Sequence, residues 1–123
     1  MALIGIGIDL VDIERFRRSL ERTPSMRTRL FTPTELAYVE PKADPVPSLA
    51  ARFAAREAVM KSLGLGLGAF GFHDVWVERA ESGAPSLMVT GRALELADAA
   101  GVSQWHLSLT HSASTAGAYV LAE

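Results

Sequence analysis

The feature that most constrains the fold is a pair of small-residue faces, one on a predicted strand and one on a predicted helix. Residues 3–9 alternate, with isoleucines on one face and with Gly5 and Gly7 on the other, which predicts a strand. Glycine weakens a strand and commonly marks a close approach by another backbone segment or by a ligand. Residues 49–63 have helical spacing, with alanines four residues apart along one flank. We expect the glycine face of the strand to lie close against this alanine flank.

Two carboxylates would be brought together by that packing. Asp9 ends the glycine-faced strand, and Glu57 lies near the alanine flank, one turn before Lys61. Two carboxylates at short range repel each other unless a cation or a shared proton intervenes. Oxygen ligands of this kind suit Mg²⁺, which keeps several waters and commonly binds through substrate phosphates. The alternatives are an ordinary ion pair between Glu57 and Lys61, and a cap or turn role for Asp9.

The remaining elements do not alternate regularly between strand and helix. Asp12 is a predicted N-cap for a helix over 13–21, Thr32 and Glu35 form a capping-box pattern, and Ser48 is a predicted cap for the long helix. Further strands are expected at 75–78, 87–89, 105–110 and 118–122, and a short helix at 92–100. The sequence therefore predicts an α+β fold in which a mostly antiparallel sheet packs against the long central helix.

Length and composition set the outer limits. With 123 residues, 49% of them hydrophobic and 21% charged, the chain is expected to form a single domain over 1–123. It contains no cysteine, which excludes disulfides, thiol catalysis and thiolate metal sites. No stretch reaches the roughly 20 apolar residues of a membrane span, and the apolar start lacks a basic leader. We expect a soluble cytoplasmic domain.

The charges are unevenly distributed. Lysine and arginine number 12 against 14 acidic residues, for a net charge of −2, yet residues 15–29 hold six arginines and one acidic residue. On a helix over 13–21, Arg15, Arg18 and Arg22 lie opposite the apolar stripe and would face water. A basic ridge of arginines favours an anionic partner, through carboxylates or phosphates. The alternative is a solvated helix face without a partner.

Two further features, a glycine-rich loop and a histidine at a strand end, each allow a functional and a structural interpretation. Residues 64–71 contain four glycines but match neither the P-loop nor the dinucleotide fingerprint, so the loop is either flexible or close to a phosphate ligand. His111 closes a predicted strand, a position common in functional sites, although a structural role is the alternative. The chain has no Gly-x-Ser-x-Gly elbow, so serine hydrolase chemistry is not expected.

Three segments together resemble a known family. They are GIGIDLV at 5–11, RFAAREAVMK at 52–61 and LSLTH at 107–111. Their order and the chain length are similar to those of the small holo-[acyl-carrier-protein] synthases, which are single-domain 4′-phosphopantetheinyl transferases. The resemblance implies the fold of that family. It also implies transfer of 4′-phosphopantetheine from coenzyme A to a serine of apo acyl carrier protein, with release of adenosine 3′,5′-bisphosphate, in fatty acid or polyketide biosynthesis.

The resemblance also implies roles for individual residues. Asp9 and Glu57 would hold Mg²⁺, and Glu57 and Lys61 would be catalytic, with Lys61 on the phosphates. Residues expected to contact coenzyme A are Arg52, Lys61, Gly64, Gly66, Thr110 and His111. Residues expected to contact the carrier protein are Arg15, Arg18, Arg22 and Arg29. The serine proton would pass to Glu57 or to a metal-bound water. The family implies a homotrimer with sites between subunits, and no nucleic acid or membrane partner.

The chain departs from the family pattern at three positions. Arg56 stands where a lysine usually precedes the metal-binding glutamate, so we assign proton transfer to Lys61 because the pKa of arginine is too high. Leu65 replaces the threonine of a common Gly-Thr-Gly, and Ala84 replaces a basic residue that often precedes the hairpin proline. Two other functions fit parts of the pattern: a non-catalytic module whose arginines dock an acidic protein or RNA, and a nucleotide-binding protein.

Overall fold

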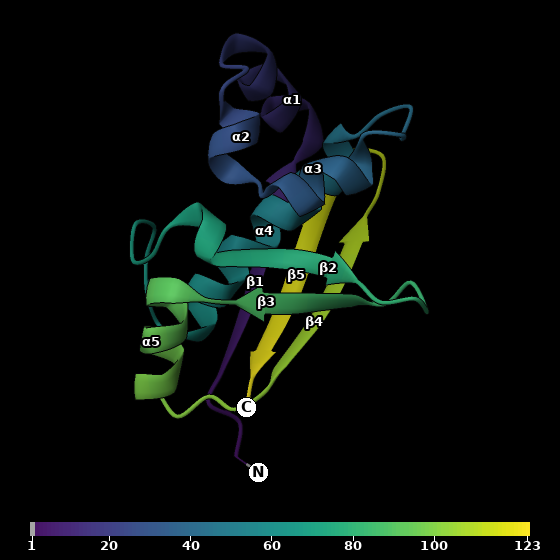
Figure 1. Cartoon of the computed structure of the whole chain (residues 1–123). Coiled ribbons are helices and arrows are strands. Elements are labelled where there is room, and N and C mark those ends of the chain that lie inside the picture. The colour runs from purple at the N-terminus through teal and green to yellow at the C-terminus, as the bar shows by residue number, and fades with distance from the viewer. Residues whose placement is uncertain (1) are drawn as a thin grey trace.

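Strand β1 (Gly5–Asp12) pairs antiparallel with β5 (Thr115–Ala122), which also pairs antiparallel with β4 (Trp105–His111), so that one sheet has the order β1-β5-β4 (Figure 1). The computed structural model describes residues 2–123 and contains a second antiparallel sheet of β2 (Val75–Arg79) and β3 (Pro85–Val89). The predicted α+β fold with antiparallel sheets is confirmed. Residue 1 of the expected domain lies outside the described residues.

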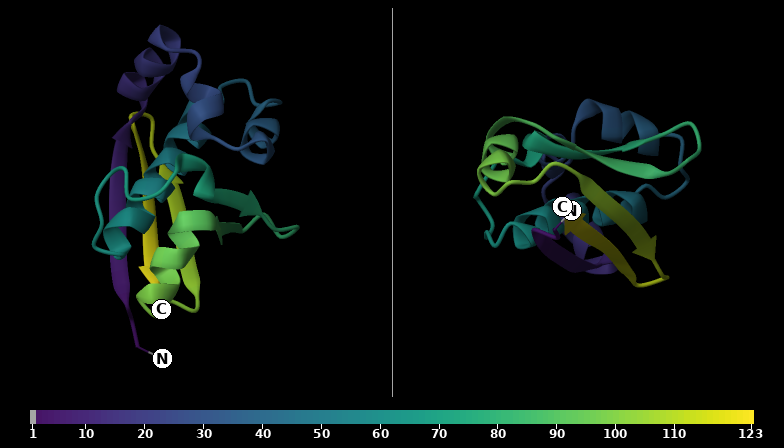
Figure 2. Two further views of the ribbon diagram at one scale, coloured as in Figure 1. Left: turned by 60° about the vertical axis from the view of Figure 1, so that its left-hand side comes forward. Right: turned by 90° about the horizontal axis from the view of Figure 1, so that it is seen from below.

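The long helix lies between the two sheets (Figure 2). The α-helices are α1 (Ile13–Arg22), α2 (Met26–Leu30), α3 (Pro33–Val39), α4 (Val46–Ser62) and α5 (Gly91–Ala99), and a short 3-10 helix is η1 (Phe72–Asp74). Buried alanines of α4 pack with Val77 of β2 on one side and with Val120 of β5 on the other. Within residues 2–123, no helix combines the length and the apolar character needed to cross a membrane.

The predicted contact between small-residue faces is present. A Cβ atom added to Gly7 would lie 1.9 Å from the carbonyl oxygen of Ala58, and one added to Gly5 would lie 1.8 Å from that of Ser62. Both clashes are with backbone, which cannot turn aside as a flexible side chain could. Glycine at these two positions therefore allows β1 to contact the backbone of α4 directly.

The opposite face of β1 is open. Ile6, Ile8 and Leu10 are 49%, 54% and 66% exposed, and Tyr119 of β5, opposite Ile8, is also exposed. Side chains of a strand alternate between faces, so burying the glycine face against α4 necessarily turns this isoleucine face outward. Contiguous exposed apolar surface of this kind marks an interaction site.

Side-chain capping explains where α1 and α3 begin. Asp12 accepts a hydrogen bond from the Arg15 backbone N–H at 2.9 Å, and the predicted capping box of Thr32 and Glu35 is present. The prediction that Ser48 caps the long helix is wrong, because α4 begins at Val46, with prolines on either side that fit the first helical turn. Helix α2 was not predicted, and β1 runs to residue 12 because its pairing with β5 continues there.

Candidate active site

Asp9 of β1 and Lys61 of α4 form the first contact of the site. The Lys61 ammonium donates to Asp9 Oδ1 at 3.0 Å and to the Ile8 carbonyl oxygen at 3.0 Å. The Asp9 side chain is only 17% exposed, whereas that of Lys61 is 53% exposed. The contact follows from the close approach of β1 to α4, since a wider separation would leave these side chains apart.

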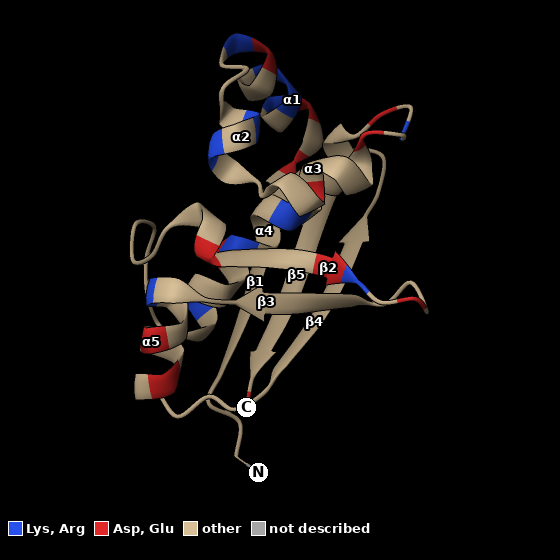
Figure 3. Ribbon diagram, in the orientation of Figure 1, with Lys and Arg blue, Asp and Glu red and all other residues tan. Residues whose placement is uncertain are grey.

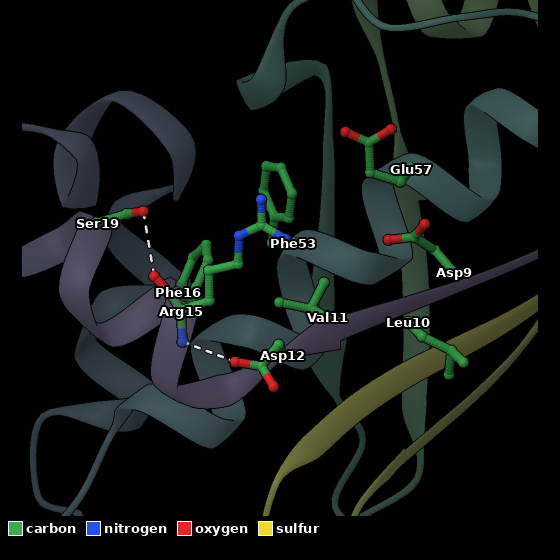
Figure 4. Close-up of a pocket in the computed structure, with 9 residues that line it drawn as sticks. All are labelled: Asp9, Leu10, Val11, Asp12, Arg15, Phe16, Ser19, Phe53 and Glu57. Carbon is green, nitrogen blue, oxygen red and sulfur yellow. Dashed lines mark hydrogen bonds between the residues drawn. The ribbon is translucent and has the colours of Figure 1, made fainter.

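Glu57 completes the group one turn before Lys61. Burial raises the pKa of the Glu57 carboxyl, repulsion from Asp9 raises it further, and Lys61 lowers it. The two carboxylates are therefore near enough to influence each other, as the sequence predicts. Figure 4 shows both side chains emerging from adjoining elements, Asp9 from β1 and Glu57 from α4.

A pocket of ≈ 320 Å³ includes both carboxylates. Its lining residues are Asp9, Leu10, Val11, Asp12, Arg15, Phe16, Ser19, Phe53 and Glu57 (Figure 4). One end of the pocket is acidic, the wall between α1 and α4 is aromatic, and an arginine of α1 lies at the other end. The pocket thus connects the carboxylate pair to the helix that carries the arginine ridge.

The donor set fits a divalent cation. A hard cation would relieve the repulsion between Asp9 and Glu57 and would be bound by the oxygen ligands it prefers. In the described part of the chain, residues 2–123, there is no cluster of three or more acidic or histidine side chains that could hold a metal. A cation on Asp9 and Glu57 would therefore keep positions for water and for the oxygens of a substrate.

The arginine ridge lies at one end of the molecule, on α1 and α2 (Figure 3). Arg15, Arg18, Arg22 and Arg29 are all exposed, as the helical spacing predicts for the first three. Arg17 differs from them because its guanidinium pairs with Asp44 and Glu14 of the same chain. We use the name arginine ridge for the four exposed residues only.

The residues that were expected to contact coenzyme A lie in different parts of the structure. Gly64 and Gly66 follow α4 in an open loop, where an added Cβ would meet no atom within 4 Å. Thr110 is opposite Gly117, which pairs with Leu10, so its side chain lies on the open face of the sheet and not in the Asp9 pocket. The adjacent His111 ends β4 and is exposed. Within one chain the structure does not bring these residues to the carboxylates.

Arg52 lies in a second pocket, of ≈ 280 Å³, between α3 and β2. It is 1% exposed, its guanidinium is 4.7 Å from the centre of the Tyr38 ring, and its Nε has no hydrogen-bond partner. Lys42 and Arg79 approach the same ring, at 5.2 Å and 5.6 Å. Burial, together with repulsion from Arg79, lowers the pKa of Arg52. The pocket itself is lined by two cations, Arg52 and Arg79, and by the carboxylate of Glu78.

Arg56 has a structural role that the sequence did not reveal. Its guanidinium is buried and forms a bidentate pair with Glu35, at 3.0 Å and 2.5 Å, while its Nε donates to the Phe72 carbonyl oxygen at 2.7 Å. Glu35 also accepts from the Val77 backbone N–H, so the pair joins α3, α4, η1 and β2. Arg56 points into the core and is not among the residues that line the carboxylate pocket.

Comparison with known proteins identifies the family. Residues 5–122 match the model of the 4′-phosphopantetheinyl transferase superfamily, and the chain belongs to that superfamily. A holo-[acyl-carrier-protein] synthase of Streptomyces avermitilis is 49% identical, over 100% of this chain and 99% of that protein. One from Micrococcus luteus is 45% identical, over 98% of this chain and 92% of that protein.

Solved structures agree with the family assignment. The chain superposes on holo-[acyl-carrier-protein] synthase from Neisseria meningitidis with a TM-score of 0.89 and 31% identity, covering 99% of each chain. It superposes on the Helicobacter pylori enzyme in complex with coenzyme A with a TM-score of 0.81 and 28% identity, covering 96% of this chain and 99% of that one. The fold implied by the sequence resemblance is confirmed.

Proposed function

We propose that this chain transfers 4′-phosphopantetheine from coenzyme A to a serine of apo acyl carrier protein and releases adenosine 3′,5′-bisphosphate. The observation that carries the proposal is the convergence of Asp9, Glu57 and Lys61 on one pocket that leads to the arginine ridge. The names of its relatives, and the coenzyme A bound to one of the similar structures, support the same reaction. No nucleophile is needed in this chain, because the attacking serine belongs to the carrier.

Transfer of a phosphoryl-type group depends mainly on charge neutralisation and positioning. Asp9 and Glu57 would hold Mg²⁺, which when bound neutralises the pyrophosphate of coenzyme A. Lys61 adds a second positive charge beside the same carboxylates and is half exposed, so its ammonium can reach the phosphate of the leaving group. Arg56 cannot share that task because it is buried against Glu35.

Glu57 is the residue we assign to accept the proton of the attacking serine. A general base works best when its pKa lies near the operating pH. Burial and the neighbouring Asp9 raise the pKa of the Glu57 carboxyl, and Lys61 lowers it. The side chain also lines the pocket through which a carrier serine docked on α1 would arrive.

Coenzyme A would bind across a subunit boundary. The open apolar face of β1 and β5 is suited to packing against further copies of the chain, and we propose that it forms the interface of a homotrimer. Thr110 lies on that open face and would approach the pocket of a neighbouring subunit, whereas the adjacent His111 shares the opposite face with Val11 and would contact a neighbour from the exposed end of β4. The glycines at 64 and 66 would supply further contacts to the coenzyme, whereas the Arg52 side chain is 1% exposed and its Nε is enclosed, so it would not contact the coenzyme in this arrangement.

Mass spectrometry of the carrier tests the proposed reaction. A bacterial apo acyl carrier protein incubated with this chain, coenzyme A and Mg²⁺ should gain the mass of one phosphopantetheine on a serine. Glu57→Gln should abolish the gain without unfolding the chain, and the matched control Glu95→Gln, on exposed α5, should leave it unchanged. Carrier that binds but gains no mass would indicate a non-catalytic docking module, and near-normal turnover by Glu57→Gln would contradict the role of Glu57.

A further inference from the structure

Arg17 occupies an unusual place on α1. The buried stripe of this helix is formed by Ile13, Phe16 and Leu20, and Arg17 lies at its edge, four residues after the first and three before the last. Its Nη1 and Nη2 donate to the two carboxylate oxygens of Asp44, at 2.9 Å and 2.8 Å. Two parallel bonds of this kind fix direction as well as distance. Arg17 is thus a rigid attachment, unlike the arginines of the ridge.

Asp44 connects this attachment to the catalytic helix. Its Oδ1 also accepts a hydrogen bond from the backbone N–H of Val46, the first residue of α4, at 3.2 Å. One carboxylate therefore joins the middle of α1 to the beginning of α4. A second contact between the same two helices is made by Phe16 and Phe53, whose ring centres are 5.5 Å apart. Two contacts at different points determine an angle, which one contact alone does not.

The positive charge of Arg17 is neutralised by carboxylates of the same chain. Its Nε donates to Glu14 Oε1 at 3.1 Å in addition to the bonds with Asp44. These hydrogen bonds raise the pKa of Arg17, and the bond from Arg17 lowers the pKa of Asp44. Two carboxylates around one guanidinium leave no net positive charge to attract an acidic protein. Arg17 therefore differs in function from its neighbours Arg15 and Arg18.

We propose that Arg17 and Asp44 are a positioning pair that sets the angle between α1 and α4, and with it the placement of a carrier protein bound to the arginine ridge. This inference rests on the proposed function, because the carrier must dock on α1 while its serine reaches Glu57 of α4. Reactions between two bound groups are sensitive to displacements of about 1 Å. The ridge attracts the carrier, and the pair determines where the carrier serine arrives.

Steady-state kinetics at several salt concentrations test the pair. Because a displaced serine reacts more slowly, Arg17→Gln should lower kcat with apo acyl carrier protein about threefold, with the KM for coenzyme A and the thermal unfolding midpoint unchanged. The double variant Arg17→Gln with Asp44→Asn removes one positive and one negative charge, so the salt dependence of its carrier KM should remain as in the wild type. The matched control is Arg18→Gln, which removes an exposed ridge charge and should flatten that salt dependence.

A double-mutant cycle completes the test. Asp44→Asn keeps an oxygen for the Val46 N–H but loses the charged pair, so it should lower kcat as Arg17→Gln does, and the double variant should be no worse than either. Additive effects, an unchanged kcat, or a flattened salt dependence in the charge-neutral double variant would overturn the proposal. A wild-type chain that modifies no carrier would instead contradict the proposed function, and the positioning role with it.

Discussion

At the scale of single residues, the site depends on three side chains that alter one another's charge. Asp9 and Glu57 repel, and Lys61 compensates part of that repulsion through its bond to Asp9. A pair of carboxylates with one lysine is unfavourable in isolation but well matched to a cation and a pyrophosphate. The repulsion between Asp9 and Glu57 in the unliganded site therefore indicates the kind of ligand that the site is built to bind.

The pKa of Glu57 should respond to both neighbours, in opposite directions. Asp9→Asn removes a negative charge and should lower the pKa of Glu57, whereas Lys61→Met removes a positive charge and should raise it. Side-chain carboxyl NMR over a pH titration measures both shifts. Asp98→Asn, on α5, serves as the control and should cause no shift; equal titration of Glu57 in all three variants would contradict the electrostatic coupling.

The residues of the site differ in whether their contacts could be predicted from the sequence. Asp9, Glu57 and Lys61 could be predicted, because a glycine face and an alanine flank imply proximity between a strand and a helix. The pair between Arg56 and Glu35 could not, because charged residues on a helix are normally assigned to solvent. Its partner lies 21 residues away and was recognised only as a capping residue, so nothing local indicated that the two are buried together.

At the scale of elements, the contact between β1 and α4 determines the geometry of the site. Both carboxylates lie along this contact, and its width is set by two glycines. The predicted elements are present in the predicted order, but α2 was missed, and α4 begins at Val46, before the predicted start at residue 49, because its flanking prolines fit the start of a helix. Whether a proline-containing segment begins a helix or remains a loop depends on the tertiary packing of that segment.

Gly7→Ala should be strongly destabilising. The new Cβ would lie 1.9 Å from the Ala58 carbonyl oxygen, so β1 and α4 must separate, at a cost of about 3 kcal/mol in the free energy of unfolding. Chemical denaturation measures the loss. The matched control is Gly66→Ala, where an added Cβ meets nothing, and equal stability of the two variants would show that the close contact is not required.

Charge reversal on α1 should weaken carrier recognition selectively. Arg15→Glu combined with Arg22→Glu should raise the carrier KM and flatten its salt dependence, because exposed charges act mainly on encounter and orientation. Affinity for coenzyme A, measured by calorimetry, should change little. Arg92→Glu, on exposed α5, provides the comparison, and an unaltered carrier KM in the double variant would argue against the ridge.

At the scale of the whole molecule, one face of the β1-β5-β4 sheet is covered by α4 and the other is open. The alternation of residues 3–9 and the alanine flank of the helix predicted that the glycine face would be the covered one, although isoleucine is the more usual core residue, and the structure confirms it. The isoleucine face is therefore free for the interface proposed above, and Thr110, which shares the face of Leu10, points away from the carboxylates of its own subunit.

Ile6→Lys should therefore disrupt assembly. A lysine in the centre of the open apolar face would place a charge in the proposed interface, which is costly to bury without a partner. Analytical ultracentrifugation should show a trimer for the wild type and a single subunit for the variant, with lower transferase activity. Leu94→Lys, at an exposed leucine of α5, should remain trimeric; a trimeric Ile6→Lys would exclude this face as the interface.

The most direct test of the central claim is anomalous X-ray diffraction from crystals grown with coenzyme A and Mn²⁺ as a substitute for Mg²⁺. We predict one strong peak per chain, within about 2.3 Å of carboxylate oxygens of both Asp9 and Glu57 and in contact with an oxygen of the coenzyme pyrophosphate. A fully occupied coenzyme without such a peak, or a peak that touches neither carboxylate, would contradict the account.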